Sequence, residues 1–387
     1  MVKKSTIDTT LAMLCMLTPV SPGIFAKKLV IVSTALLILR ILSSRNLLYL
    51  IKKKFLILLL FVPSIIITTF NSPEELIRFV PVLLLVFGFP FYGFKVQARP
   101  IMIFSICIIV FFVITQYFIA VGNTVVINFR EVWYPSIYSE VWNYGSVDEV
   151  INAFRAFRAG GLYFNPNTLA KITVLYYFIF SVSSKYIQQK NINFSRTKIL
   201  GFVILILVVF SIYFTGSRTS LVSLMTFIVV SNFEMSFLKK GLIKKNTFWA
   251  LLFILIFLIL VKDEILLGFD SEGSANIKFQ ILMNYLNSSN FLEILFGGTY
   301  NVHFDNEYGN WIGSTGFFGM LAWFFILRML YITIPSIRDL IFPFLMTAVG
   351  STLFYGLLTG SIVIILLVIT SSFWWQSNTE NENSIDL

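Results

Sequence analysis

Charged side chains are scarce in this chain, since Asp, Glu, Lys and Arg together make up only 12% of its 387 residues. A typical soluble domain carries about 25% charged residues. Here 57% of the residues are hydrophobic, the mean hydropathy is +0.84, and apolar runs of membrane-spanning length recur along the chain. The scarcity of charge excludes an ordinary soluble domain and predicts a polytopic helical membrane protein.

Residues that bind metals or form disulfides are also rare. The single histidine is His303, and the two cysteines, Cys15 and Cys107, lie within apolar runs. We therefore expect neither a zinc site nor a disulfide. The chain has no P-loop, GxSxG, CxxC or HExxH motif. We expect no metal and no cofactor.

The apolar runs predict an all-α fold, with one transmembrane domain over residues 1–387 and about twelve helices. The first two runs are interrupted by Pro19 and Pro22, so a helical hairpin is an alternative there. The predicted spans are residues 9–25, 29–43, 55–70, 76–93, 101–121, 167–184, 199–214, 219–236, 247–262, 309–327, 339–354 and 357–374.

Lysine and arginine set the predicted orientation. With these spans, loops such as 95–99, 185–198 and 239–245 carry most of the basic residues and fall on one side, which the positive-inside rule assigns to the cytoplasm. Both termini are then cytoplasmic. The same rule accounts for the net charge of +10, so no nucleic-acid partner is expected.

Two long loops, about residues 122–166 and 263–308, are predicted on the opposite, external side. They are rich in Asn, Tyr, Glu and Gly rather than in lysine. Long connections with polar and aromatic content of their own are usually functional. Aromatic rings that stack on sugar faces, next to amides that pair with hydroxyls, are also typical of sugar binding.

The first loop ends in the segment FRAFRAGGLYFNPNTLAKI. Arg155 and Arg158 are spaced to share a helix face, and two glycines after them allow close backbone approach. Asn165 and Asn167 flank a proline at the predicted start of a helix, and Lys171 follows one turn later. Two arginines beside a helix N-terminus indicate an anion site, and pairing with acids of the same loop is the alternative.

A second motif, TGSRTS, joins two predicted spans on the external side. Arg218 lies there against the positive-inside preference and is flanked by hydroxyls and a glycine. A guanidinium next to free helix N–H groups binds phosphate well. The alternative is that Arg218 reaches toward lipid headgroups.

The third motif, NVHFDNEYGNWIGSTGFFG, begins in the second long loop and runs into an apolar helix. It holds His303, Asp305 and Glu307, which are the candidate proton acceptors, and Asn306 and Tyr308, which could bind substrate. Such a density of proton-handling groups at the edge of a span indicates an active-site loop. An ordinary polar loop before a helix is the alternative.

In this order, on a chain with about twelve spans, the three motifs resemble the O-antigen polymerase and ligase superfamily. These are bacterial inner-membrane glycosyltransferases that act on polyprenyl phosphates without a metal. The similarity covers about residues 150–330. Asp305 stands where the ligase pattern has a histidine, while Gly316 and Gly319 fit the end of that pattern. This departure favours a polymerase.

The resemblance implies a reaction and its residues. A growing glycan on undecaprenyl pyrophosphate would be transferred to a new lipid-linked repeat unit, with inversion. The family's arginines correspond to Arg218 and to either Arg155 or Arg158. The base would be Asp305, His303 or Glu307. A flippase and a chain-length regulator are expected partners.

Two alternatives are a ligase that transfers glycan to lipid A-core and a lipid-linked oligosaccharide flippase. A flippase needs ionisable residues along a central path, and mid-span charges are nearly absent.

Overall fold

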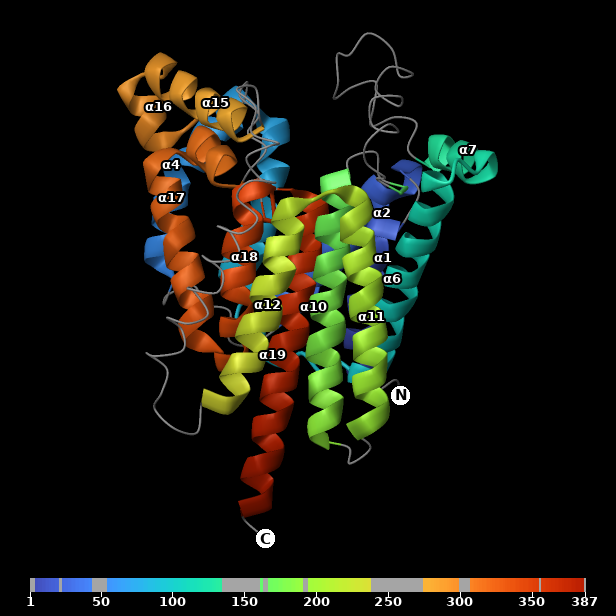
Figure 1. The fold of residues 1–387 in the computed structure, drawn as a ribbon. Helices are drawn as coiled ribbons and strands as arrows, with labels where there is room; N and C mark the ends of the chain where they lie inside the picture. Colours follow the sequence, from blue (N-terminus) through green and yellow to red (C-terminus); the bar gives the residue numbers. More distant parts are fainter. Residues whose placement is uncertain are drawn as a thin grey trace. The chain divides into compact units, whose positions relative to one another are not determined.

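The described part of the chain is helical throughout (Figure 1). The computed structural model describes residues 4–20, 23–43, 54–133, 161–162, 166–190, 194–237, 274–298, 307–354 and 356–385. Within these ranges every regular element is an α- or 3-10 helix and there is no strand. The all-α prediction is therefore confirmed for the described residues.

The chain divides into two compact units. Unit 1 comprises residues 1–53, 80–221 and 356–387, and unit 2 comprises residues 54–79 and 222–355. The boundary between residues 221 and 222 falls inside helix α12 (Arg218–Phe237), whose first residues belong to unit 1 and whose remainder belongs to unit 2. The two long polar loops contribute helices α7 (Thr124–Trp133), α15 (Ser274–Ser288) and α16 (Phe291–Phe296).

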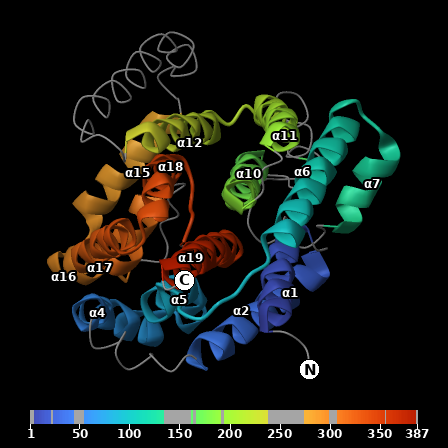
Figure 2. The same ribbon diagram turned by 90° about the horizontal axis from the view of Figure 1, so that it is seen from below.

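Helix α10 (Pro166–Lys190) lies at the centre of unit 1. It packs against α6 (Ala98–Ala120), α11 (Phe194–Thr215) and α19 (Leu357–Ile385), as Figures 1 and 2 show. Of the most apolar stretch of α19, 83% is buried, against 44% for α6. A helix that is buried on all sides is a core helix, whereas α6 keeps one apolar face outward.

Two predicted spans are wrong as continuous helices: 9–25 in unit 1, and 76–93, which crosses from unit 2 into unit 1. Helix α1 (Lys4–Leu17) ends in a 3-10 turn at Thr18–Val20, and α2 (Gly23–Leu42) packs back against α1. The hairpin alternative therefore fits this region. The run 76–93 also breaks, into a 3-10 segment (Pro73–Phe79) and the nine-residue α5 (Val80–Gly88). Proline at positions 19, 81 and 90 removes N–H donors that a continuous helix needs.

Three helices of the described residues are long and apolar enough to cross a membrane. They are α6, α17 (Glu307–Thr333) and the Leu357–Asn378 part of α19, while shorter apolar helices cover Phe55–Asn71, Ile199–Thr215 and Arg218–Ser231. These helices are compatible with a membrane protein. The predicted total of twelve spans stays a prediction, and the predicted span at 247–262 lies outside the described residues.

Unit 2 is built around α17, which packs against α4 (Phe55–Asn71), α16 and α18 (Arg338–Gly350). A short 3-10 turn (Pro335–Ile337) connects α17 to α18. Aromatic rings fill the centre of unit 2. The ring centroids lie 5.9 Å apart for Phe61 and Trp311, 6.3 Å for Trp311 and Trp323, and 4.8 Å for Trp323 and Phe354. Rings at these separations attract one another beyond the apolar surface they bury.

Helix α17 is broken at Gly316, whose φ of 63° and ψ of −163° are not helical. The Ser64 hydroxyl of α4 lies 3.0 Å from the carbonyl oxygens of both Phe296 and Thr315, so one proton serves two acceptors at the break. A Cβ added to Gly316 would lie 2.5 Å from the Leu295 carbonyl oxygen. Backbone irregularity within a spanning helix needs such protein partners, because lipid offers none.

We expect Gly316→Ala to destabilise unit 2 by about 2–4 kcal/mol, because it adds both a left-handed alanine and a backbone clash. Gly201→Ala in α11 is the matched control, since a Cβ there meets nothing within 4 Å and Gly201 has no positive φ. The measurement is the thermal unfolding of both purified variants. Equal melting temperatures would show that the break does not require glycine.

Candidate functional site

The predicted site residues divide into three groups. Asn167, Lys171 and Arg218 lie in unit 1, and Glu307 and Tyr308 lie in unit 2. The other predicted residues lie outside the described part of the chain: Arg155, Arg158, Asn165, His303, Asp305 and Asn306. Their roles stay predictions.

The start of α10 and the start of α12 lie at the same end of unit 1. Helices α10 and α11 pack side by side, and only three residues separate Lys190 from Phe194, so the two helices run antiparallel (Figure 1). The end of α11 is then level with the start of α10. Arg218 begins α12 three residues after Thr215, so Asn167, Lys171 and Arg218 share this end.

Gln116 places Gly161 of the first motif at the same end. Its side-chain Nε2 donates to the Ser211 carbonyl oxygen in the last turns of α11, at 3.0 Å. Gly161 (φ 61°) packs beside it, because a Cβ there would lie 3.7 Å from Gln116 Cα and 3.0 Å from Leu169 Cδ2. Gly161 of the first motif therefore lies at the same end of unit 1 as the second motif. The sequence analysis missed Gln116, although it is the only amide side chain within the predicted span 101–121.

The turn before Arg218 is ordered by its hydroxyls. The Thr215 hydroxyl donates to the Ile212 carbonyl oxygen at 2.7 Å, and Gly216 (φ 61°) ends α11. The Ser217 carbonyl oxygen accepts from Leu221 N–H at 3.1 Å and its hydroxyl donates to Ser220 Oγ at 3.0 Å, so Ser217 caps α12. Arg218 is the first residue of the helix and is exposed.

A cation at a helix N-terminus opposes the helix dipole, since both are positive. An anion held between the guanidinium and the N–H groups would turn this repulsion into attraction on both sides. The geometry at Arg218 therefore suits an anionic ligand.

Lys171 differs from Arg218 in its surroundings. It is only 5% exposed, whereas Arg218 lies at the surface. Burying an ammonium group is costly unless it has partners. The buried ammonium group of Lys171 therefore needs partners within the protein at this end of α10. That Lys171 and Arg218 bind the same anion stays a prediction.

Glu307 is fully buried in unit 2 and both of its carboxylate oxygens accept hydrogen bonds. Oε1 accepts from Trp311 Nε1 at 2.7 Å and from Phe354 N–H at 3.0 Å, and Oε2 accepts from Leu353 N–H at 2.6 Å. The carboxylate thus fastens the first turn of α17 to the segment that follows α18. Hydrogen bonds to a charged group are about twice as strong as neutral ones.

This arrangement favours a positioning role for Glu307. A general base needs an oxygen within reach of the hydroxyl that it deprotonates, and both oxygens of Glu307 face groups of its own unit. Tyr308 is also engaged in packing, since its hydroxyl donates to the Leu345 carbonyl oxygen of α18 at 3.3 Å. Among the described residues, no group of three or more His, Cys, Asp and Glu side chains could hold a metal ion.

We expect Glu307→Gln to lower the free energy of unfolding by about 2–3 kcal/mol, because an amide offers one oxygen acceptor in place of two and leaves a buried N–H unpaired. Glu293→Gln is the control, since Glu293 accepts one exposed backbone N–H in the capping box of α16. Thermal unfolding and the yield of folded protein measure the effect. A stable but inactive Glu307→Gln protein would instead assign Glu307 to the chemistry.

Comparison of the sequence with the known protein families and with curated protein sequences gives no match.

Proposed function

We propose that this protein is a membrane glycosyltransferase that polymerises oligosaccharide repeat units carried on undecaprenyl pyrophosphate. The observation that carries the proposal is that Gly161 of the first motif and Arg218 of the second lie at the same end of unit 1. A polyprenyl pyrophosphate needs cations at a membrane surface and backbone that can approach closely. This end supplies an exposed guanidinium, a helix N-terminus and a glycine that faces α6 and α10.

In the proposed reaction, a sugar hydroxyl of the acceptor repeat unit attacks the anomeric carbon of the donor glycan. The new glycosidic bond forms as the bond to the pyrophosphate oxygen breaks, and undecaprenyl pyrophosphate leaves with the electron pair. Negative charge grows on the leaving group, so Arg218, with Arg155 or Arg158, would stabilise the transition state. Direct displacement of this kind inverts the anomeric centre.

The proton of the attacking hydroxyl would go to Asp305 or His303. Glu307 follows them closely in sequence but is held by Trp311, Leu353 and Phe354, which supports a role in placing the loop rather than in accepting the proton. Asn165, Asn167, Asn306 and Tyr308 are the proposed sugar-binding residues, and Lys171 would add positive charge near the pyrophosphate.

The lipid carrier explains why the chain is dominated by apolar helices. We propose a multi-pass protein of the bacterial inner membrane with about twelve spans, cytoplasmic termini and an active site facing the periplasm. Sugar nucleotides are absent there, so a lipid pyrophosphate is the activated donor that such a site would use.

We expect Arg218→Ala to abolish polymer in cells while the protein level in the membrane is unchanged. Arg218→Lys should retain part of the activity, because a lysine keeps the charge but loses the bidentate geometry. Arg99→Ala is the control, since Arg99 is exposed in the first turn of α6, at the opposite end of that helix from Gln116. A normal polymer ladder in Arg218→Ala cells would remove Arg218 from the mechanism.

The lipopolysaccharide profile of a null strain separates polymerase from ligase. A polymerase defect leaves lipid A-core capped with a single repeat unit, whereas a ligase defect leaves the core without any repeat unit. We expect the single-repeat profile, and Asp305→Asn should reproduce it if Asp305 is the base. A core without repeat units would assign the protein to the ligases.

A further inference from the structure

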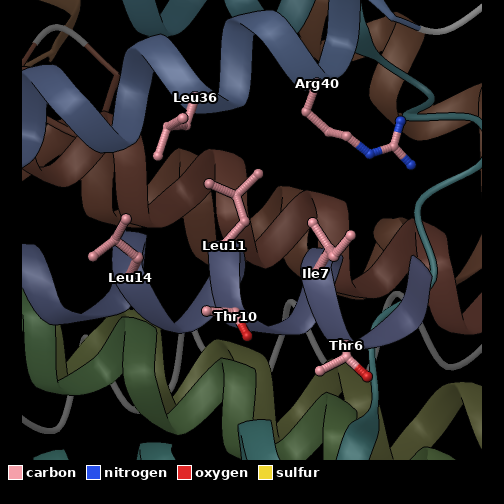
Figure 3. A pocket seen from close by; sticks show the side chains of 7 residues that line it. All are labelled: Thr6, Ile7, Thr10, Leu11, Leu14, Leu36 and Arg40. Carbon is pink, nitrogen blue, oxygen red and sulfur yellow. The ribbon is translucent and has the colours of Figure 1, made fainter. Parts of the chain in front are cut away.

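An open apolar groove runs between α1 and α2 in unit 1 (Figure 3). Its volume is about 440 Å³. It is lined by Thr6, Ile7, Thr10, Leu11 and Leu14 on α1 and by Leu36 and Arg40 on α2. Pockets of about 300–1,000 Å³ are large enough for small ligands. The walls offer almost no polar surface, so the groove suits a hydrocarbon chain.

One end of the groove carries a guanidinium that is held in a fixed position. Arg40 Nε donates to Asp8 Oδ1 at 2.7 Å, and Arg40 Nη2 donates to Asp8 Oδ2 at 3.1 Å and to the Gly93 carbonyl oxygen at 2.9 Å. The guanidinium also lies over the Phe94 ring, 4.5 Å from its centroid. A bidentate, stacked arginine has little freedom to move.

The Lys4 side chain and the backbone of Lys95 also lie at this end. Lys4 Nζ lies 3.7 Å from the position that a Cβ on Gly93 would occupy. The backbone of Lys95 is held next to Asp8, since Lys95 N–H donates to Asp8 Oδ2 at 2.9 Å. Both lysines are exposed, and three cations against the single carboxylate of Asp8 leave this end positively charged.

We infer that the groove binds an anionic phospholipid of the surrounding bilayer, with one acyl chain between α1 and α2 and the phosphate beside Lys4 and Lys95. Two observations favour a lipid occupant over another helix. The cations lie at one end of an apolar channel, which matches an amphiphile with a charged head. Neighbouring side chains of α2 are also strongly exposed and apolar, with Ile31 at 55% and Leu39 at 63%, as on a lipid-facing surface.

The inference does not rest on the proposed glycosyltransferase activity. Lys4 and Lys95 belong to the loops that the positive-inside rule places in the cytoplasm, whereas the proposed donor binds on the opposite side. Anionic lipids of the cytoplasmic leaflet attract basic residues next to membrane helices. The occupant is therefore a structural phospholipid rather than the polyprenyl donor.

The test measures lipid binding to the purified protein by native mass spectrometry. It compares phosphatidylglycerol with phosphatidylcholine, both with identical acyl chains. We expect the wild-type protein to prefer phosphatidylglycerol by about thirtyfold, from two lysines near the phosphate. The double variant Lys4→Gln/Lys95→Gln should bind both lipids equally. Lys28→Gln, an exposed lysine near the other end of α2, should keep the wild-type preference.

A second pair of variants tests the groove itself. Leu36→Trp fills it and should reduce binding of both lipids, whereas Leu39→Trp, on the exposed face outside the groove lining, should not. Equal binding of the two lipids by the wild-type protein would overturn the inference, as would an unchanged preference in the lysine double variant. Stronger binding of undecaprenyl phosphate than of phosphatidylglycerol would also overturn it. So would finding that the wild-type protein is a dimer and that Leu36→Trp dissociates this dimer without changing lipid binding.

Discussion

The structure depends on a few buried polar side chains that hydrogen-bond to partners far apart in the sequence. In an apolar helical bundle, water is not at hand to complete a broken hydrogen-bond ladder. The Glu307 carboxylate meets this need three times, through Trp311 Nε1 and two backbone N–H groups. Ser64 does the same for two carbonyl oxygens at the break in α17. These contacts fix the helix that follows the polar stretch 301–306.

The same constraint acts in unit 1. The Asp8 carboxylate accepts from Arg40 and from Lys95 N–H, so one buried acid joins α1, α2 and the segment before α6. Gln116 joins α6 to α11 through the Ser211 carbonyl oxygen. In each case a single polar side chain within an apolar helix sets the register between elements that are far apart in sequence.

The helical class and the positions of the central helices could be predicted from the sequence, because long apolar runs leave few alternatives. Helix α6 agrees with the predicted span 101–121, and α10, α11 and α12 cover their predicted spans and extend beyond them. The breaks could not be predicted in detail. Hydropathy averages over a proline or a glycine, so it could not reveal that α17 is interrupted at Gly316 or that the run 76–93 divides before Val80.

The site could be predicted only as a set of motifs. The sequence placed Arg218 at a helix start, as the structure has it, and the approach of Gly161 to the same end depends on tertiary packing that no local pattern encodes. The role of Glu307 could not be read from the sequence either. Its partners Leu353 and Phe354 follow it by more than forty residues and donate backbone N–H groups, which carry no sequence signature.

The central claim is that guanidinium groups, without a metal, neutralise the pyrophosphate leaving group. The most direct measurement is polymerisation of purified lipid-linked repeat units by the purified protein in the presence of EDTA, with the release of undecaprenyl pyrophosphate followed alongside. The account predicts a polymer ladder and one released carrier for each bond formed, both unaffected by the chelator. Loss of polymer in EDTA that is restored by Mg²⁺ would contradict it.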